Sequence, residues 1–208
     1  MRKYTIEFFG TFFLLLISAL SENPIAIGLG LAALIYTGAH ISGAHYNPAV
    51  SLAMFIRGEI NRKDLLFYIV FQILGAIFGS LAYFLITNGF FEIEPNSSTT
   101  RNQFLIAEFI FTFLLVITIL FVATHPKIKK NNYYGAVIGL VVVASQYSIG
   151  DISSSVLNPA ISIGPSLFNI ADSGSINMSL AFSPYYIAIT LIASVFSAYI
   201  YNFYLKED

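Results

Sequence analysis

The chain carries one short motif twice, as Asn47-Pro48-Ala49-Val50-Ser51 and again as Asn158-Pro159-Ala160-Ile161-Ser162. Asn is a favoured helix N-cap, and Pro is favoured at the first helical position because its missing N–H is not needed there. Each motif therefore predicts the start of a helix. The segments Asn47–Arg57 and Asn158–Phe168 would each be about 16 Å long, roughly half the thickness of a bilayer core. We expect two re-entrant half-helices.

The composition around these motifs is that of an integral membrane protein. Of the 208 residues, 57% are hydrophobic and 10% are charged, whereas a soluble chain carries about 25% charged residues. The formal net charge is −1, which gives no electrostatic reason to expect binding to nucleic acid. The chain has no Cys, which excludes disulfides, thiolate metal sites and cysteine nucleophiles.

Six further stretches are apolar and long enough to cross a bilayer, which takes about 17–25 residues in a helix. A helix is expected in each stretch because no water in the bilayer core satisfies an exposed backbone. Ser183-Pro184 is interpreted as the cap and first turn of the last one. The predicted spans are Tyr4–Leu20, Ile25–Ile41, Leu65–Ile86, Phe104–Ala123, Tyr134–Ile149 and Pro184–Tyr204.

The basic residues predict the orientation of these spans. With six crossings, both termini lie on the same side of the membrane. Nine of the ten Lys and Arg residues fall on that side and only Arg101 falls on the other, so both termini are predicted to be cytoplasmic. The nine residues are Arg2, Lys3, Arg57, Arg62, Lys63, Lys127, Lys129, Lys130 and Lys206.

The two halves of the chain repeat each other. Glu7-Phe8-Phe9-Gly10-Thr11-Phe12 in the first span matches Glu108-Phe109-Ile110-Phe111-Thr112-Phe113 in the fourth, and the two Asn-Pro-Ala motifs follow the second and fifth spans. Three spans per repeat is an odd number, so the copies cross the membrane in opposite senses. We predict one membrane channel domain, 1–208, built from a first repeat, 1–95, and a second, inverted repeat, 96–208. Such repeats place a pathway at their interface, near the midplane.

Inverted symmetry brings the N-termini of the two half-helices together at the centre of the membrane. Each N-terminus carries roughly half a positive charge. Because the cap occupies the side-chain oxygen of Asn47 and of Asn158, each amide NH₂ is expected to be free to donate outward. Such a centre offers hydrogen-bond donors to a neutral molecule and repels a cation.

With these motifs the chain resembles the aquaporin family of major intrinsic proteins. The stretch His40-Ile41-Ser42-Gly43-Ala44-His45-Tyr46-Asn47-Pro48-Ala49-Val50 is close to the first signature of that family, and Leu157-Asn158-Pro159-Ala160 with Gly164-Pro165 is similar to the second. The resemblance covers essentially the whole chain. It implies an all-α membrane fold, six transmembrane helices with two half-helices, and passive passage of water and small uncharged solutes. It also implies a homotetramer in the lipid bilayer of the cell membrane, one pore per protomer and no cofactor.

The resemblance further implies which residues form the narrowest point of the pore, on the extracellular side. The four positions of that selectivity filter correspond to Ile27, Gln146, Ser155 and Ile161. The family normally has arginine where this chain has Ile161. The ring is therefore half aliphatic, and we expect weaker discrimination against urea, ammonia or glycerol.

Other residues resemble the water-selective branch of the family. They are Ser162, Ser166 and the pair Tyr185-Tyr186. These residues favour a water-selective channel, whereas Ile161 favours a less selective one. We therefore rank water first and leave the second solute open.

Two acids, Glu7 and Glu108, lie within predicted spans, where a charge is costly unless it has a partner. One interpretation is a proton-coupling pair. The other, which the resemblance supports, is that each carboxylate accepts hydrogen bonds that hold a re-entrant loop. Symmetric placement and the lack of an intramembrane Lys or Arg favour the structural role. His45 is expected to brace its own loop.

Two other classes of function remain open. An ion-coupled secondary transporter also uses inverted repeats and half-helices, but it needs coupling acids at the substrate site. A structural membrane protein with a closed pore would be distinguished by a permeability assay. The sequence offers no nucleophile–base pair or metal cluster for an enzyme.

Overall fold

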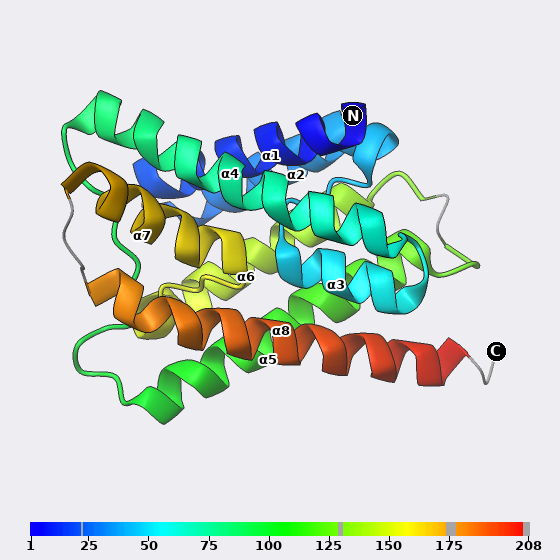
Figure 1. Ribbon diagram of the computed structural model, residues 1–208. Coiled ribbons are helices and arrows are strands. Elements are labelled where there is room, and N and C mark those ends of the chain that lie inside the picture. The colour runs from blue at the N-terminus through cyan, green and yellow to red at the C-terminus, as the bar shows by residue number, and fades with distance from the viewer. Residues whose placement is uncertain (22, 129–130, 174–177, 206–208) are drawn as a thin grey trace.

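The chain folds as a bundle of long helices that encloses two shorter ones (Figure 1). This computed structural model describes residues 1–21, 23–128, 131–173 and 178–205. Three of the basic residues that predict the orientation, Lys129, Lys130 and Lys206, lie outside the described residues. Within those ranges, six helices have the length and hydropathy of membrane spans, as predicted. They are α1 (Arg2–Leu20), α2 (Pro24–Ser42), α4 (Arg62–Thr87), α5 (Arg101–Ile119) continued by the π-helix η1 (Leu120–Thr124), α6 (Tyr134–Ser153) and α8 (Met178–Leu205).

The two half-helices begin at the two Asn-Pro-Ala motifs. Helix α3 (Pro48–Arg57) is capped by Asn47, whose side-chain oxygen accepts from the backbone N–H of Ala49 at 2.8 Å. Helix α7 (Pro159–Ser173) begins in the same way, with Asn158 accepting from the N–H of Ala160 at 3.0 Å. The predicted helix starts are confirmed, and α7 extends five residues beyond the predicted end at Phe168.

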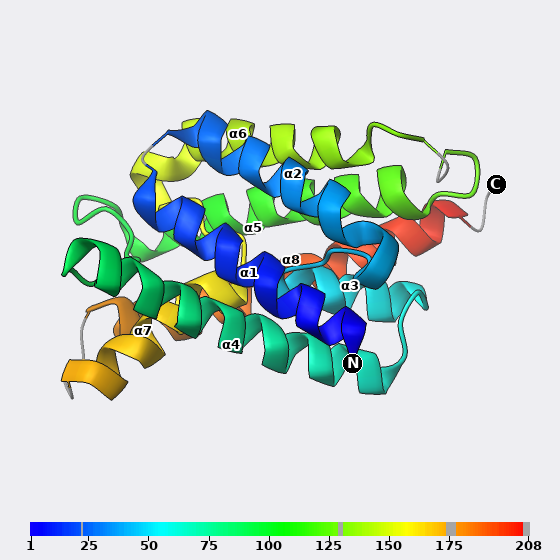
Figure 2. The same cartoon turned by 90° about the horizontal axis from the view of Figure 1, so that it is seen from above.

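The half-helices interleave the two halves of the chain. Helix α3 packs most extensively against α8, and α7 packs against both α4 and α8. Helices α1 and α4 lie side by side, as do α2 and α6, and the same pairs are visible from above (Figure 2). Because each half-helix contacts a span of the other half, neither half forms a separate layer.

Glycines allow some of these helices to approach closely. A Cβ placed on Gly75 of α4 would lie 2.3 Å from the carbonyl oxygen of Phe8 in α1. A Cβ placed on Gly139 of α6 would lie 2.4 Å from the carbonyl oxygen of Gly28 in α2. Apolar side chains cannot drive helix association in lipid as they do in water, so close backbone packing contributes much of the contact energy.

The start of the last span differs from the prediction. Helix α8 begins at Met178, and Pro184 lies inside the helix. Ser183 does not cap a helix because its hydroxyl donates to the carbonyl oxygens of Ser162 and Ser179, both at 2.8 Å. The hydroxyl thereby joins α8 to α7, and the helix runs through the predicted boundary.

Candidate functional site

A cavity of about 740 Å³ lies between the two halves of the bundle. At one end its lining includes Glu92 and Asp151, and at the other end it includes Ala123 and Tyr134. Helices α1, α2, α5 and α6 supply much of the wall, and the chain segments before α3 and α7 supply the rest. The cavity therefore follows the interface at which the sequence predicts a pathway.

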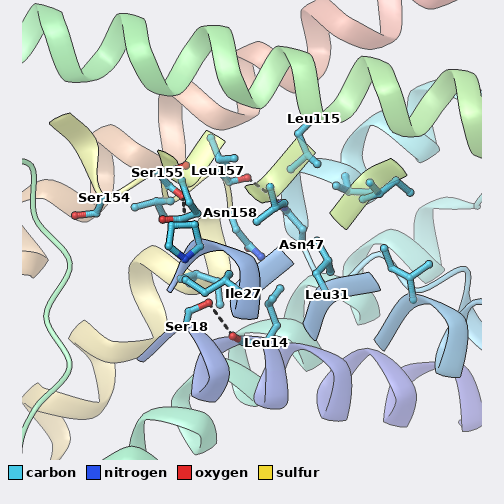
Figure 3. Close-up of a pocket in the computed structure, with 18 of the residues that line it drawn as sticks. Leu14, Ser18, Ile27, Leu31, Asn47, Leu115, Ser154, Ser155, Leu157 and Asn158 are labelled. Atoms are coloured by element: carbon cyan, nitrogen blue, oxygen red, sulfur yellow. Dashed lines mark hydrogen bonds between the residues drawn. The ribbon is translucent and has the colours of Figure 1, made fainter. Parts of the chain in front are cut away.

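The two cap residues meet in the middle of this cavity, and each binds the opposite loop (Figure 3). The Nδ2 of Asn47 donates to the carbonyl oxygen of Leu157 at 2.9 Å, and the Nδ2 of Asn158 donates to the carbonyl oxygen of Tyr46 at 2.9 Å. This corrects the prediction that both amide groups are wholly free. Tip-to-tip contact places a backbone carbonyl beside each amide, so one N–H of each Asn is used, and the described residues supply no acceptor for the other.

The loops that precede the two half-helices share an unusual backbone. Ala44 and Tyr46 in the first loop have φ of 53° and 51°, and Ser155 and Leu157 in the second have φ of 46° and 53°. A left-handed conformation costs a non-glycine residue about 1–2 kcal/mol. Such a backbone persists only where its surroundings hold it in place.

A buried carboxylate holds the first loop. Glu7 of α1 has no exposed surface, and its carboxylate accepts from the backbone N–H of His45 at 3.0 Å and of Tyr46 at 2.6 Å. It also accepts from the hydroxyl of Ser42 at 2.6 Å and from the Nε2 of Gln72 at 2.8 Å. Four donors therefore satisfy this carboxylate without an ion pair among the described residues.

Glu108 of α5 makes three of the four corresponding contacts in the second half, without a counterpart of Gln72 among the described residues. Its buried carboxylate accepts from the backbone N–H groups of Val156 and Leu157, both at 2.9 Å, and from the hydroxyl of Ser153 at 2.7 Å. Ser42 and Ser153 each lie five positions before a cap Asn, so the two sets follow the same pattern. The structure thus brings both acids to the loops.

Several of the residues that support the loops were not found from the sequence. The hydroxyl of Tyr68 donates to the carbonyl oxygen of Ser42 at 2.6 Å, and the hydroxyl of Tyr186 donates to that of Ser153 at 2.8 Å. The repeat gives a signal that could have found them, because these contacts occupy matching positions in the two halves. From the sequence, Tyr186 was noted only for its resemblance to the water-selective branch, and Tyr68 was not singled out.

His45 contacts the first half-helix as well as the cavity. Its Nδ1 lies 3.1 Å from the Oγ of Ser51, which also accepts from the Nε2 of Gln72 at 2.9 Å. The imidazole packs edge-on against Tyr68. His45 lines the cavity and is 7% exposed. It therefore connects its loop to the first turn of α3.

The four predicted filter residues all line the cavity. Ile27 of α2 and Ile161 of α7 are buried and place aliphatic groups there. The Nε2 of Gln146 donates to the carbonyl oxygen of Ser155 at 3.0 Å. The hydroxyl of Ser155 is buried and has no hydrogen-bond partner among the residues that the structure describes. This ring has two polar side chains, and neither of them carries a charge.

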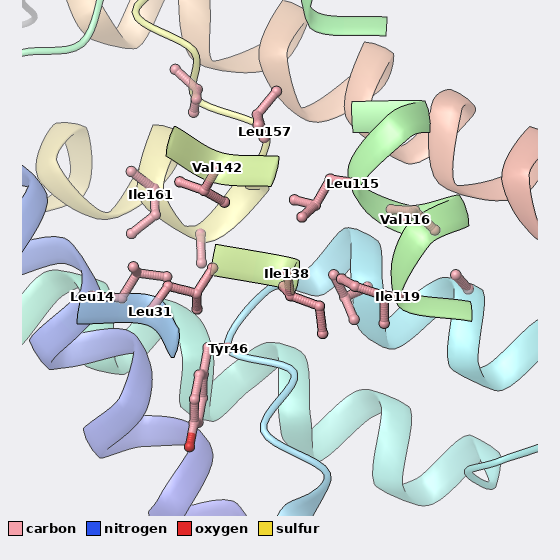
Figure 4. Close-up of a cluster of buried hydrophobic side chains, with 14 of the residues drawn as sticks. Leu14, Leu31, Tyr46, Leu115, Val116, Ile119, Ile138, Val142, Leu157 and Ile161 are labelled. Carbon is pink, nitrogen blue, oxygen red and sulfur yellow. The ribbon is translucent and has the colours of Figure 1, made fainter. Parts of the chain in front are cut away.

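Beside the two Asn residues, part of the cavity wall consists of aliphatic side chains, several of which are drawn in Figure 4. Aliphatic side chains give a passing molecule no hydrogen bond, so polar contacts along them come from the loop backbone and from a few polar side chains such as His45. A conduit with few polar contacts binds its solute weakly, which fast passage requires. The side chains are Leu31, Leu115, Ile119, Ile138 and Val142.

Comparisons with known proteins agree with this geometry. Residues 1–201 match the family model described as major intrinsic protein. The chain is 30% identical to Aquaporin AqpM of Methanothermobacter marburgensis, with 99% of this chain and 98% of that protein covered. It is 34% identical to Glycerol uptake facilitator protein-like 6 of Lactiplantibacillus plantarum, with 81% and 84% covered. The X-ray structure of the aquaglyceroporin from Plasmodium falciparum has the same fold, with a TM-score of 0.81 at 22% identity over 96% of this chain and 93% of that one.

Proposed function

Because this chain belongs to the major intrinsic protein family, and is therefore a passive channel for water and small solutes, we propose that water is its first solute. The observation that carries this proposal is the reciprocal pair of hydrogen bonds between Asn47 and Leu157 and between Asn158 and Tyr46. Each amide keeps one N–H for the oxygen of a passing molecule.

Cations are excluded at the same place. The N-termini of α3 and α7 face each other there, and each contributes roughly half a positive charge. A neutral molecule accepts a hydrogen bond from Asn47 or Asn158, whereas a cation meets a positive field and loses hydration. The helix starts are fixed by the two residues that follow each Asn, namely Pro48 and Ala49 or Pro159 and Ala160. Both Ala residues are wholly buried, and their small side chains allow the helix tips to meet.

The outer ring sets the choice among neutral solutes. Ile27, Gln146, Ser155 and Ile161 form this selectivity filter, in which no side chain supplies a positive charge. Relatives named as aquaporins and one named as a glycerol uptake facilitator both align with most of the chain. Urea, ammonia and glycerol are therefore the second solutes to compare with water.

Glu7, Glu108 and His45 act as structural supports rather than in proton coupling. The hydrogen bonds that each carboxylate accepts from its loop support this role, because a carboxylate bound in this way is not available to bind and release a substrate proton. The alternative of an ion-coupled transporter would need a substrate-facing acid in the middle of the cavity, where the structure has the two Asn residues.

The channel consists of inverted repeats 1–95 and 96–208 and assembles as a homotetramer in the plasma membrane with both termini in the cytoplasm. The excess of basic residues at the end of the bundle that carries the termini supports this orientation. The apolar outer faces of the spans, with Leu29, Leu66 and Ile106 exposed, suit contact with lipid or neighbouring subunits.

Stopped-flow light scattering on proteoliposomes tests the proposal. Vesicles with the channel should shrink faster than empty vesicles under a sucrose gradient, with a lower activation energy than lipid permeation. Glycerol and urea gradients, applied to the same preparation, then rank the second solutes. A rate equal to that of empty vesicles at a verified protein density would support the closed-pore alternative and overturn the proposal.

Mercuric chloride should leave the water permeability of this channel unchanged. Mercury binds soft thiolate ligands, and the chain has no Cys, with Ser155 in the outer ring. A matched Ser155→Cys variant should become sensitive, and a thiol reagent should restore its flux. Inhibition of the parent protein that a thiol reagent reverses would contradict the proposed pore.

A further inference from the structure

Tyr46 differs from the other loop residues because its side chain leaves the cavity and enters the space between α1 and α2. Its ring points away from the aliphatic wall (Figure 4), and only 2% of the residue is exposed. Its hydroxyl donates to the carbonyl oxygen of Leu34 in α2 at 3.0 Å. The side chain is therefore fixed at its far end by a hydrogen bond.

Two glycines make room for this ring. A Cβ on Gly10 of α1 would lie 2.0 Å from the Cε1 of Tyr46, and a Cβ on Gly38 of α2 would lie 1.9 Å from its hydroxyl oxygen. No side chain larger than a hydrogen atom fits at either position while the ring is present. Tyr46 and these two glycines form a complementary set, which we call the Tyr46 wedge.

The backbone of Tyr46 binds two groups of the conduit. Its N–H donates to the carboxylate of Glu7 at 2.6 Å, and its carbonyl oxygen accepts from the Nδ2 of Asn158 at 2.9 Å. Its φ of 51° is a strained conformation for a residue with a Cβ. Fixing the ring therefore fixes the carbonyl that orients the amide of Asn158.

The second half of the chain has the same loop backbone but places the corresponding side chain elsewhere. Leu157 has the same backbone conformation and the same two types of backbone hydrogen bond, but its side chain lines the cavity. The positions that match Gly10 and Gly38 in the repeat are Phe111 and Ile149, two large residues. The two glycines of the first half are replaced by large residues in the second, which leave no matching space between the helices, and Leu157 points into the cavity instead. Among the described residues the wedge is therefore a feature of the first half.

From this asymmetry we infer that Tyr46 is a positioning residue for cation exclusion, acting by holding the amide of Asn158 toward the conduit. This inference rests on the proposed role of Asn158 in the pore. Without the wedge the loop carbonyl moves, the amide loses its partner, and its remaining N–H is no longer directed at the solute. Water both accepts and donates hydrogen bonds, so the permeability to water should fall little when the amide turns. Cation exclusion depends on the direction of the amide and should weaken more.

The test is a double-mutant cycle on Tyr46→Leu and Gly10→Ala in proteoliposomes. Sodium leak and water permeability are measured on the same vesicles, and the leak is expressed per unit of water flux. Tyr46→Leu should raise this ratio about tenfold, the size of a typical coupling between contacting residues. Tyr46→Phe, which keeps the ring and loses only the hydroxyl, should stay within about twofold of the parent because one net hydrogen bond is worth little.

Gly10→Ala should change the leak-to-water ratio in opposite directions in the parent and in Tyr46→Leu. In the parent it collides with the ring and should raise the ratio and lower the melting temperature. In Tyr46→Leu the Cε1 and Cζ that this Cβ would meet are gone and the remaining δ-carbon can turn aside, so Gly10→Ala should bring the ratio back to within about threefold of the parent, because contacting residues are not additive. Gly89→Ala is the matched control, since a Cβ there meets no atom nearer than 3.6 Å.

The outcomes separate this inference from the proposed function. A parent protein without water flux would overturn the proposed function itself. A conducting parent, with Tyr46→Leu at an unchanged leak-to-water ratio or with Gly10→Ala failing to restore it, would overturn the inference. If Tyr46→Leu alone does not fold, recovery of folded, selective channel on adding Gly10→Ala supports the wedge, and failure to recover contradicts it.

Discussion

Asn158→Asp is expected to make the channel leak cations while its water permeability falls. The substitution replaces the Nδ2 that donates to Tyr46 with an oxygen that faces the same carbonyl. It also places a negative charge at the N-terminus of α7, where roughly half a positive charge now repels cations. Both changes act at the residue that is 4% exposed in the middle of the conduit.

The size of the effect follows from Coulomb's law. A unit negative charge about 4 Å from a cation stabilises it by about 4 kcal/mol at an effective dielectric of 20. That energy corresponds to about a thousandfold increase in cation occupancy at the centre. The lost hydrogen bond lets the loop relax, which narrows or misaligns the path for water.

Paired measurements of sodium leak and osmotic water flux test this expectation. Asn158→Ala removes the donor without adding charge, so it should reduce water flux with a much smaller leak. Asn96→Asp is the matched control for charge, because Asn96 is exposed and its side-chain oxygen, which Asp retains, accepts from the N–H and the hydroxyl of Ser98. Parent-like flux with no leak in Asn158→Asp would show that the motif does not line the conduit.

Much of the fold could be predicted from the sequence because its signals are local. The six apolar runs, the Asn caps and the Pro residues at helix starts each act within a few residues, and the structure follows them. The predicted start of the last span was wrong because Ser183 lies inside α8 and binds Ser162 of α7, a contact between helices that local patterns do not encode. The predicted end of the second half-helix at Phe168 was five residues too early.

The geometry at the centre was less accessible from the sequence for a related reason. A cap position predicts where the oxygen of Asn47 binds, but not that the amide reaches the carbonyl of Leu157, 110 residues away. The wedge of Tyr46 was missed because each of its residues has an ordinary explanation alone. Only contact between helices shows that Gly10 and Gly38 leave space for one ring.

The symmetry of the support explains why the loops tolerate a strained backbone. After its helix C-cap, each loop contains two more left-handed residues, and each loop receives a carboxylate from the first span of its own repeat, Glu7 or Glu108. The charge cost of burying a carboxylate is offset by its hydrogen bonds, and the strain of the loop is offset by the same bonds. Removing the carboxylate would therefore leave the strained loop without its hydrogen bonds, and a change in the loop would leave the buried carboxylate without its donors.

Ile161→Arg should lower the permeability to urea and glycerol more than the permeability to water. Ile161 lines the outer ring with Ile27, Gln146 and Ser155, and its methyl groups offer a solute no hydrogen bond and no charge. The position lies in the first turn of α7. An Arg there adds several N–H donors to the ring and occupies more of its width. The permeability to larger solutes should therefore fall more than the permeability to water.

The charge of the new Arg also adds a second barrier to cations. At an effective dielectric of 20, a unit positive charge about 4 Å away opposes a cation by about 4 kcal/mol, in addition to the barrier at the paired helix ends. Any residual proton conductance of the parent should therefore fall in the variant. Ile161→Met is the matched control, because it changes shape in the ring without adding charge or a donor.

Paired urea and water fluxes, measured in vesicles of parent and variant at equal protein density, decide whether Ile161 relaxes the filter. A urea flux that falls several-fold further than the water flux, with Ile161→Met close to the parent, supports an electrostatic and steric filter at this position. Equal reduction of both fluxes would mean that the side chain at position 161 only packs or plugs the conduit. In that case the outer ring is not where this channel distinguishes its solutes, and the aliphatic character of Ile27 and Ile161 carries no consequence for selectivity.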